Sequence, residues 1–554
     1  MIEVDTSCVD WEKRILAGES LITAPPIFPD AADYALNIFK ELRIVDLLGR
    51  PTIGEVTRDW IFDFAGAFFG SLDEAENIRH ITEFFLLISK KNTKSTIASG
   101  LMMTVLILNQ RESAEFLILA PTKDAANNVY KPAADMVRAD DELKVLFQVQ
   151  DHLRTITHRN TKAQLKVVAA DSDTVSGSKA TGVLIDELWA FGKKARAASM
   201  LTEATGGLMS RPEGFIIYLT TQSDEPPAGV FLEKLRYARA VRDGTIRDPR
   251  FLPVIYEFPP DMIESKAYLD PKNYYITNPN LGASVSVEML ERKLEMAKQG
   301  GDESIQEVVA KHLNVEIGLN LRSNRWSGVD YWELQQDSSI TLETLLERCE
   351  VIDVGIDGGG LDDLLGVAVI GREKGGRKWL SWCQAYAHKV ALERRKQEAP
   401  RFNDFKRAGD MVIVDRIGDD VELVCDIVEQ IDEAGLLDKV GVDPVGIGAI
   451  LDALDERGID EEKIIGISQG WKLGGAIKTA ERRLGEGLLI VADQALMRWC
   501  AANARVEPRG NAILITKQAS GNGKIDPLMG FFNAISLISL NPPAACKKYQ
   551  MLFV

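Results

Sequence analysis

The sequence predicts an α/β protein with two domains. Short apolar runs alternate with helical lengths between residues 81 and 219, and the same alternation begins again at Val351. Such runs are typical of buried parallel sheets. Between the two regions, Pro259, Pro260 and the turn-rich NPNLG at 278–282 predict a linking subdomain. We therefore expect an N-terminal extension at 1–55, a first α/β domain at 56–260, a linker subdomain at 261–340, a second α/β domain at 341–540 and a tail at 541–554.

Composition excludes several classes of protein. The 554 residues include 65 Lys and Arg against 82 Asp and Glu, a net charge of −17, so any contact with nucleic acid must be local. The six cysteines form no CxxC pair, which argues against a disulfide framework or a zinc module and favours a reducing cytoplasm. The five histidines do not pair at HxxxH spacing, so carboxylates would have to bind any catalytic metal. We expect no secretory signal, because the acidic N-terminus lacks an apolar segment. We also expect no membrane span, because the apolar runs fall short of the ~18 to 20 residues that a span needs.

The first candidate site follows the apolar run FFLLI. The loop SKKNTKST at 89–96 comes next, and then an apolar pattern typical of a helix. A strand, a tight loop and a Lys-Ser pair that opens a helix place backbone N–H groups and the helix dipole around a phosphate. Lys94 would reach the β- and γ-phosphates and Ser95 would hold Mg²⁺. The Gly usual before this Lys is Thr93 here, so a merely solvated, lysine-rich surface remains an equal alternative.

Two further strands end in residues that suit nucleotide hydrolysis. The run 183–187 ends in Asp186, which could hold magnesium through water, and Glu187, which could polarise the attacking water. The stretch of sequence between the lysine loop and this acidic pair leaves room for one intervening strand at 115–120. A strand at 214–219 ends in hydroxyl and amide groups suited to sensing a γ-phosphate, namely Thr220, Thr221 and Gln222. An acidic or polar strand exit without function remains open for both segments.

The second candidate site consists of acids at strand ends. Val351 begins an alternating strand that carries Asp353 and Asp357 on one face, and Asp363 leads into a return strand. Asp443 closes the run KVGV, and Asp526 precedes Pro527 and an apolar helix. Such carboxylates can hold two metal ions about 3.5 to 4 Å apart for phosphodiester cleavage, which is the logic of an RNase H-like nuclease. An ordinary turn at Asp443 and an ordinary helix cap at Asp526 are the alternatives.

Taken together, these segments resemble the large terminase subunit of tailed double-stranded DNA bacteriophages, from about residue 60 to 538. The resemblance rests on an ordered set of motifs: LLISKKNTKST, LAPTKDAA, VSGSKATGVLIDELWAF, LTTQS, NPNLG, KHLNV, GIDGGGLDDLLGVAVI, GVDPVGIGA and GKIDPLMGFFNAI. It implies a P-loop ATPase domain of the additional-strand type followed by an RNase H-like nuclease domain.

The resemblance also implies roles for individual residues. ATP binding falls to Lys90, Asn92, Thr93, Lys94, Ser95, Thr96 and Asp186, with Trp60 near the adenine; Glu187 is catalytic, and Thr220, Thr221 and Gln222 couple hydrolysis to movement. In the nuclease, Asp357, Asp443 and Asp526 match the metal-binding catalytic acids and Asp363 is a supporting metal-binding acid. Asp353 and Asp362 match nothing and are expected to be structural.

The implied cofactors are ATP and Mg²⁺, with Mn²⁺ able to substitute in the nuclease. The implied partners are double-stranded DNA, a small terminase subunit, the portal of the procapsid and further copies of the chain, as a pentamer on the portal in the host cell cytoplasm. DNA would contact small basic patches at Arg322 and Arg325, at 394–396, or at Arg482 and Arg483, each of which is otherwise a solvated face.

Two rival functions remain. The first is another P-loop DNA motor fused to a nuclease, such as a helicase-nuclease. The second is a non-catalytic docking subunit with a degenerate ATP site, because the β-branched Thr93 resists the positive φ that a phosphate loop requires. Either the loop avoids that conformation or nucleotide binding is weakened.

Overall fold

The computed structural model describes residues 4–169, 179–194, 197–300, 302–317, 326–396, 398–444, 447–509, 512–515 and 524–545. It divides into two compact units, unit 1 at Met1–Ile317 and unit 2 at Gly318–Val554. Both units are α/β, which confirms the predicted fold class. Within the described ranges, no helix is long and apolar enough to cross a membrane.

Unit 1 is built on an eight-stranded sheet. In sheet order its strands are β10 (Phe251–Ile255), β3 (Glu83–Leu87), β9 (Phe215–Thr220), β8 (Ala180–Asp186), β4 (Glu115–Ala120), β7 (Gln164–Ala169), β6 (Thr155–His158) and β5 (Phe147–Gln150). The first six strands are parallel to one another. Strand β6 is antiparallel to β7, and β5 is antiparallel to β6. Strand β9 lies between β3 and β8, so the three strands that end in candidate site residues are neighbours.

The expectation of one strand between the phosphate loop and the acidic pair was incomplete. Among the described residues, four strands lie between them in the chain, β4 to β7. Strands β5 and β6, with the sequences FQVQ and TITH, have only four residues each and carry polar side chains at alternate positions. They therefore lack the continuous apolar run by which the central strands can be recognised.

Helices cover both faces of this sheet. Helices α8, α9 and α10 contribute to one core with the side chains of β3, β4, β8 and β9. On the other face, Phe64 and Phe68 of α4 meet Phe84 of β3 edge-on. The helices of the unit up to α10 are α1 (Trp11–Ala17), α2 (Pro29–Glu41), α3 (Ile53–Val56), α4 (Asp59–Phe69), α5 (Lys94–Leu108), α6 (Lys123–Ala139), α7 (Asp141–Leu146), η1 (Asp151–Leu153), α8 (Leu188–Phe191), α9 (Ala197–Thr205), η3 (Gly206–Ser210) and α10 (Gly229–Arg242). A short hairpin joins β1 (Leu72–Asp73) and β2 (Ile78–Arg79).

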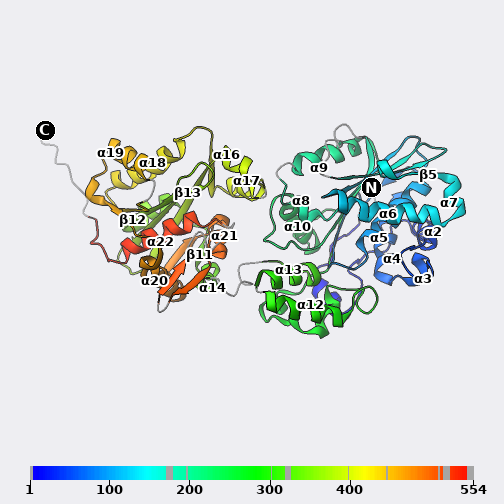
Figure 1. Ribbon diagram of the computed structural model, residues 1–554, viewed down its shortest axis with the longest axis horizontal. Helices are drawn as coiled ribbons and strands as arrows, with labels where there is room; N and C mark the ends of the chain where they lie inside the picture. The colour runs from blue at the N-terminus through cyan, green and yellow to red at the C-terminus, as the bar shows by residue number, and fades with distance from the viewer. Residues whose placement is uncertain are drawn as a thin grey trace. The chain divides into compact units, whose positions relative to one another are not determined.

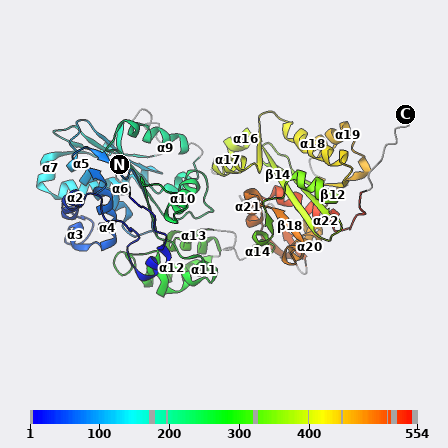
Figure 2. The ribbon, with the colours of Figure 1, turned by 180° about the vertical axis from the view of Figure 1, so that it is seen from behind.

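The segment 261–317, from the expected linker subdomain, belongs to unit 1. Its helices are α11 (Pro260–Glu264), η4 (Ala267–Leu269), η5 (Pro271–Ile276), α12 (Val287–Gly300) and α13 (Asp302–Leu313). Helices α12 and α13 pack side by side, as the green pair in Figures 1 and 2 shows. This segment also contacts the phosphate loop, as described below.

Unit 2 has a second mixed sheet. In order its strands are β11 (Gln336–Asp337), β18 (Leu489–Ala492), β14 (Trp379–His388), β13 (Leu364–Glu373), β12 (Cys349–Gly358), β16 (Leu437–Val442) and β17 (Ile464–Gly466), with β15 (Met411–Val414) also paired to β14. Strands β12, β13 and β14 are antiparallel neighbours, and β16 and β17 continue parallel to β12. A second hairpin joins β19 (Val506–Arg509) and β20 (Ala512–Ile515).

The faces of this sheet bury two separate cores. One core gathers side chains from α20, α21 and α22, and the other from α15, α18 and α19. Helix α22, red in Figure 1, lies along β12 and β13. The helices are α14 (Val329–Trp332), η7 (Glu333–Gln335), α15 (Leu342–Arg348), α16 (Lys389–Arg394), α17 (Ala399–Ala408), α18 (Asp419–Glu433), α19 (Gly448–Glu456), η8 (Glu461–Lys463), η9 (Gly470–Leu473), α20 (Gly474–Gly485), α21 (Ala495–Asn503) and α22 (Asp526–Ile538).

Glycines allow α22 to approach the sheet closely. A Cβ on Gly355 of β12 would lie 2.0 Å from the carbonyl oxygen of Gly530 in α22. A Cβ on Gly366 of β13 would lie 2.5 Å from Cα of Pro527. No larger residue fits at either position without moving the helix. The close approach places the first residue of α22, Asp526, beside the ends of β12 and β13.

Candidate functional site

The phosphate loop connects β3 to the N-terminus of α5, as the sequence predicts. Thr93 precedes the helix with φ 60° and ψ 22°, and Lys91 also has a positive φ of 75°. The loop therefore does not avoid the left-handed conformation, although Thr93 is β-branched. Such a conformation costs about 1 to 3 kcal/mol and persists only where surrounding contacts enforce it.

The NPNLG segment supplies those contacts. The side chain of Asn280 donates to Oγ1 of Thr93 over 3.1 Å, and its backbone N–H donates to Oδ1 of Asn92 over 3.1 Å. Asn92, fully buried, donates in turn to Oδ1 of Asn278 over 2.9 Å. Ser284 donates to the carbonyl of Lys91 over 2.7 Å. The loop is thus held from outside by residues about 190 positions later in the chain.

We expect Asn280→Ala to loosen this loop. The change removes the side-chain bonds of Asn280 to Thr93, to Ser284 and to Nε1 of Trp60, so unit 1 should lose about 3 kcal/mol of stability at roughly 1 kcal/mol per bond. The KM for ATP should rise, because Thr93 is no longer held. Thermal unfolding and ATPase kinetics check both effects. Asn273→Ala, which removes one bond to Ala267 in the same subdomain, is the control, and equal KM values for the two variants would contradict the prediction.

Lys94, Asp186 and Glu187 meet at the C-terminal ends of β3 and β8. Lys94 is buried, and its Nζ lies 3.8 Å from Oε1 of Glu187. Asp186 is 3% exposed, and its Oδ1 accepts no hydrogen bond from the described residues. Burial, followed by the charge of Glu187, raises the pKa of Asp186 to about 7. A buried carboxylate beside a lysine fits the chemistry of a site for Mg²⁺ and phosphate.

Glu187 is held by Trp189 of the helix that it precedes and by Thr221, which follows β9. Its backbone adopts the left-handed region, with φ 55° and ψ 52°. The indole N–H of Trp189 donates to its Oε2, and the hydroxyl of Thr221 lies 3.5 Å from the same oxygen. Strain at this position is typical of functional sites and fixes the direction of the carboxylate.

The predicted coupling segment is buried beside these acids. Thr220 accepts the backbone N–H of Trp189 over 3.0 Å, and Gln222 accepts Nζ of Lys311 at its carbonyl over 3.0 Å. The N–H of Gln222 donates to Asn314 over 3.2 Å, whereas neither atom of its side-chain amide has a partner among the described residues. A buried amide with unused donors and an unused acceptor suits recognition of a polar ligand group.

Trp60 lies beside the phosphate loop and borders a pocket of about 680 Å³. Its Nε1–H donates to Oδ1 of Asn280 over 2.8 Å, and its ring meets that of Tyr256 edge-on at 5.7 Å. Arg58, Asn278 and Leu281 also line this pocket. The structure also places the other predicted residues of the loop. Lys90 lies on the loop, is exposed, and donates its backbone N–H to the carbonyl of Lys311 over 2.7 Å. Ser95 and Thr96 lie in the first turn of α5.

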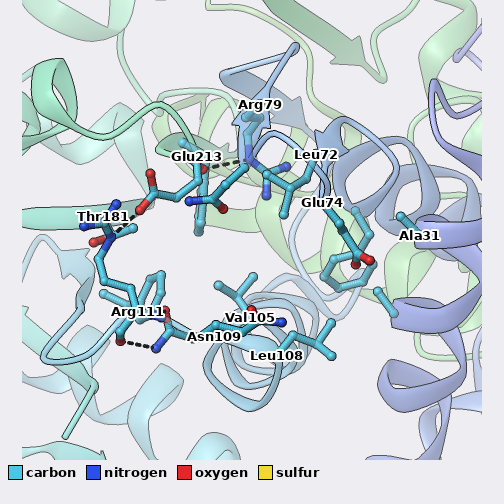
Figure 3. Close-up of a pocket in the computed structure, with 16 residues that line it drawn as sticks. Ala31, Leu72, Glu74, Arg79, Val105, Leu108, Asn109, Arg111, Thr181 and Glu213 are labelled. Carbon is cyan, nitrogen blue, oxygen red and sulfur yellow. Dashed lines mark hydrogen bonds and ion pairs between the residues drawn. The ribbon is translucent and has the colours of Figure 1, made fainter. Parts of the chain in front are cut away.

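A second pocket, of about 420 Å³, lies at the opposite ends of the strands of this sheet (Figure 3). It is lined by Phe116, Thr181 and Phe215, which lie toward the N-terminal ends of their parallel strands. Arg111 forms an ion pair with Glu213 at its wall. The acids and the coupling segment follow the C-terminal ends of the strands, so this pocket is separate from the phosphate loop.

The acids of unit 2 lie at one edge of the second sheet, namely the edge where β12 and β16 end and β13 begins. Asp357 is the next residue after Ile356, which pairs with Val442 in the parallel ladder, and Asp443 follows Val442. A Cβ on Gly358 would lie 3.4 Å from Cβ of Asp526. Asp357 and Asp526 are buried and Asp443 is partly exposed. Asp363 forms an ion pair with Lys524 near the same edge.

In the part of the chain that the structure describes, no group of three or more His, Cys, Asp and Glu side chains is close enough to hold a metal ion. Asp357, Asp443 and Asp526 therefore share an edge without converging on one point. Carboxylates are nevertheless the ligands that Mg²⁺ and Mn²⁺ prefer. By donor chemistry, these all-oxygen side chains suit Mg²⁺ or Mn²⁺ better than zinc, whose sites are built mainly from Cys and His.

Asp353 lies on β12, away from this edge. It is fully buried, its Oδ1 accepts the N–H of Lys439 over 3.0 Å, and its Oδ2 has no partner among the described residues. Burial, followed by the charge of Asp438, raises its pKa to about 8. Its contacts are those of a structural residue.

The raised pKa of Asp353 predicts a pH dependence. Between about pH 4 and pH 8 the folded state keeps a proton that the unfolded chain loses, so stability falls as pH rises through this range. We expect Asp353→Asn, which keeps the acceptor for Lys439, to flatten this dependence and to raise the free energy of unfolding by about 1 to 3 kcal/mol at pH 8. Urea unfolding at pH 5 and pH 8 checks it, and an equal loss for the variant at both pH values would refute it.

The basic runs differ in their surroundings. Arg394 lies 3.7 Å from Oδ2 of Asp362, and Arg395 donates to the carbonyl of Asp362 over 2.7 Å, in the loop that follows Asp357. Arg482 pairs with Glu486, and Arg483 lies over the ring of Trp379. Arg322 and Arg325 lie outside the described residues.

Several residues at the first site had no predicted role. They are Trp189, Asn278, Asn280, Lys311 and Asn314. The available signal was that the motifs LIDELWAF, NPNLG and KHLNV contain them. No spacing rule connects these motifs to a phosphate loop so far away in sequence.

Comparison with protein families gives two matches. The ATPase domain of the terminase large subunit matches residues 60–239, and its endonuclease domain matches residues 246–540. The endonuclease match alone spans more than half of the chain. A search of curated proteins gave no match.

Three solved structures illustrate the similarity. The large terminase of bacteriophage HK97 is 19% identical, with 91% of this chain and 99% of that chain covered and a TM-score of 0.48. A large terminase from a thermophilic bacteriophage, in complex with ATP-gamma-S, is 14% identical, with 82% and 94% covered and a TM-score of 0.30. The large terminase nuclease from thermophilic phage G20c, with bound magnesium, is 17% identical, with 39% and 97% covered and a TM-score of 0.24.

Proposed function

The chain belongs to the large terminase subunits of bacteriophages, the ATPase and endonuclease of DNA packaging, and on that premise we propose which residues perform each reaction. At the first site, Lys94 binds the β- and γ-phosphates and Glu187 orients the attacking water and accepts its proton. Ser95 and Asp186 hold Mg²⁺, which when bound offsets phosphate charge. The observation that supports these roles is the buried Lys94 beside the strained Glu187 and the buried Asp186.

Coupling belongs to the segment that follows β9. The side-chain amide of Gln222 recognises the γ-phosphate, and Thr220 and Thr221 transmit its loss through their bonds to Trp189 and Glu187. Trp60 contacts the adenine from the pocket that it shares with Tyr256. Lys90, Asn92, Thr93 and Thr96 shape the phosphate loop.

In unit 2, Asp357, Asp443 and Asp526 hold the metal ions of the nuclease, with Asp363 in support. Mg²⁺, or Mn²⁺ in its place, supplies charge stabilisation for in-line cleavage of a phosphodiester. Arg394 and Arg395 bind the DNA backbone next to these acids. Their contacts with Asp362 support this role, because they place positive charge beside the loop after Asp357.

The partners are double-stranded DNA, a small terminase subunit, the portal of the procapsid, and further copies of this chain, as a pentamer on the portal in the host cell cytoplasm. ATP hydrolysis drives DNA through the portal, and the nuclease cuts concatemers at the start and end of packaging. Family membership supports each of these partners.

Packaging is tested directly with the full chain, portal-bearing procapsids, duplex DNA and ATP. We expect DNA to become resistant to added DNase, and Lys94→Ala to abolish this protection because its ammonium binds the phosphates. Strand displacement from a forked duplex is measured in parallel. Unwinding without protection would favour the helicase-nuclease and overturn the proposed function.

A further inference from the structure

Lys311 of α13 is a buried lysine at the junction of three segments of the ATPase. It is 6% exposed, and its Nζ donates to the carbonyl of Gln222 over 3.0 Å and lies directly over the indole of Trp189. Oδ1 of Asp224 is 3.9 Å away. Burial lowers its pKa to about 7, although the charges of Asp224 and Glu187 act in the opposite direction.

A purely structural role does not account for this ammonium. Burial of a lysine is costly, and an apolar side chain of similar length would fill the same space at lower cost. The backbone of Lys311 already anchors the phosphate loop, since its carbonyl accepts the N–H of Lys90. That bond does not depend on the side chain, so the ammonium has a separate task.

The contacts of Trp189 indicate that task. Its face lies under Lys311, its Nε1–H donates to the carboxylate of Glu187, and its backbone N–H donates to Thr220. The cation–π contact fixes the plane of the indole and therefore the direction of its N–H. A line of direct contacts leads from Lys311 through Trp189 to Glu187, and a second contact leads from Lys311 to the coupling segment at Gln222.

We propose that Lys311 is a positioning residue of the ATPase, which fixes the Trp189 indole and the backbone of Gln222 together and thereby sets the direction of the Glu187 carboxylate. The proposal rests on the catalytic role of Glu187 given above. It joins the segment 261–317 to the chemical step by a side chain that does not itself touch the reacting groups.

Lys311→Met tests the proposal, because Met keeps most of the apolar length and removes the charge together with the N–H donor to Gln222. We expect the kcat for ATP hydrolysis to fall by about 100-fold, the loss typical of a misplaced catalytic group, with KM and ADP binding nearly unchanged. Lys193→Met is the matched control. Lys193 also faces the Trp189 ring, at 5.3 Å, and pairs with Asp224, but among the described residues it is Lys311 that donates to Gln222. Its kcat should stay within about twofold of the parent.

A double-mutant cycle separates positioning from independent effects. Trp189→Phe keeps an aromatic face under Lys311 and removes the N–H that holds Glu187. If Lys311 acts through Trp189, the double variant should lose about as much kcat as the more severe single variant. If the fold-losses in kcat of the two single variants multiply in the double variant, the proposal is overturned. A rise in KM for Lys311→Met without loss of kcat would also overturn it, because it would place Lys311 on the nucleotide.

Two controls distinguish failure of this inference from failure of the function it rests on. ADP binding by each variant reports whether unit 1, which contains all the substituted residues, is folded. Glu187→Gln belongs to the same series. If it lowers kcat and Lys311→Met does not, only the role of Lys311 is wrong; if neither lowers kcat, the assignment of Glu187 itself fails.

Discussion

Asp357→Asn is expected to lower DNA cleavage by about 10³-fold or more while ATP hydrolysis continues at the parental rate. Asp357 lies near the end of β12, one residue after the Ile356–Val442 pair that Asp443 also follows, and one residue before Gly358, which faces Asp526. Asn keeps the shape of the side chain and loses the negative charge that a divalent metal ion requires. Loss of several kcal/mol of transition-state stabilisation corresponds to a rate effect of this size.

The assay is conversion of supercoiled plasmid to nicked and linear forms in Mg²⁺ and in Mn²⁺, with EDTA as the blank. Asp443→Asn should behave like Asp357→Asn. Asp455→Asn is the matched control and should cleave like the parent, because Asp455 is an exposed acid of unit 2 on α19. Equal cleavage by the parent and both edge variants would show that the acids of unit 2 are structural.

The strands could be predicted where an apolar run in the sequence reflects burial on both faces of the sheet. Strands β3, β4, β8 and β9 are nearly continuous apolar runs because helices cover both faces of their sheet. Strands β5 and β6 could not be predicted because they lie at the sheet edge, where polar residues are tolerated. The packing of 261–317 onto the phosphate loop was equally hidden, since it depends on contacts between Asn280 and residues about 190 positions earlier.

The placement of individual acids at strand ends could be predicted, but the residues that contact and hold them could not. Asp186, Glu187 and Asp443 stand at strand ends, where chain direction alone brings side chains to one edge. Thr93 shows the limit of this reasoning. Its left-handed φ is unfavourable for the residue by itself and becomes acceptable only because Asn280 and Asn92 hold the loop. Local propensity therefore argued against a loop that tertiary contacts enforce.

Glu187→Gln is expected to lower ATP hydrolysis by about 10² to 10⁴-fold, the usual contribution of a general base, while ATP still binds. Gln can accept the Trp189 N–H as Glu187 does, but it cannot take a proton from water. The variant also removes the negative charge 3.8 Å from Nζ of Lys94, so this ammonium remains available to phosphate and the KM for ATP should not rise. Phosphate release and equilibrium nucleotide binding measure the two quantities separately.

Glu203→Gln is the control for the loss of one acidic charge in unit 1, because Glu203 is exposed on α9. It should hydrolyse ATP like the parent. If the parent hydrolyses no ATP with DNA and portal present, and Glu187→Gln changes nothing, the chain is a docking subunit despite its intact loop geometry. A large loss confined to Glu187→Gln would instead show that a phosphate loop with Thr93 in place of Gly supports catalysis, because tertiary contacts replace the conformational freedom that Gly provides.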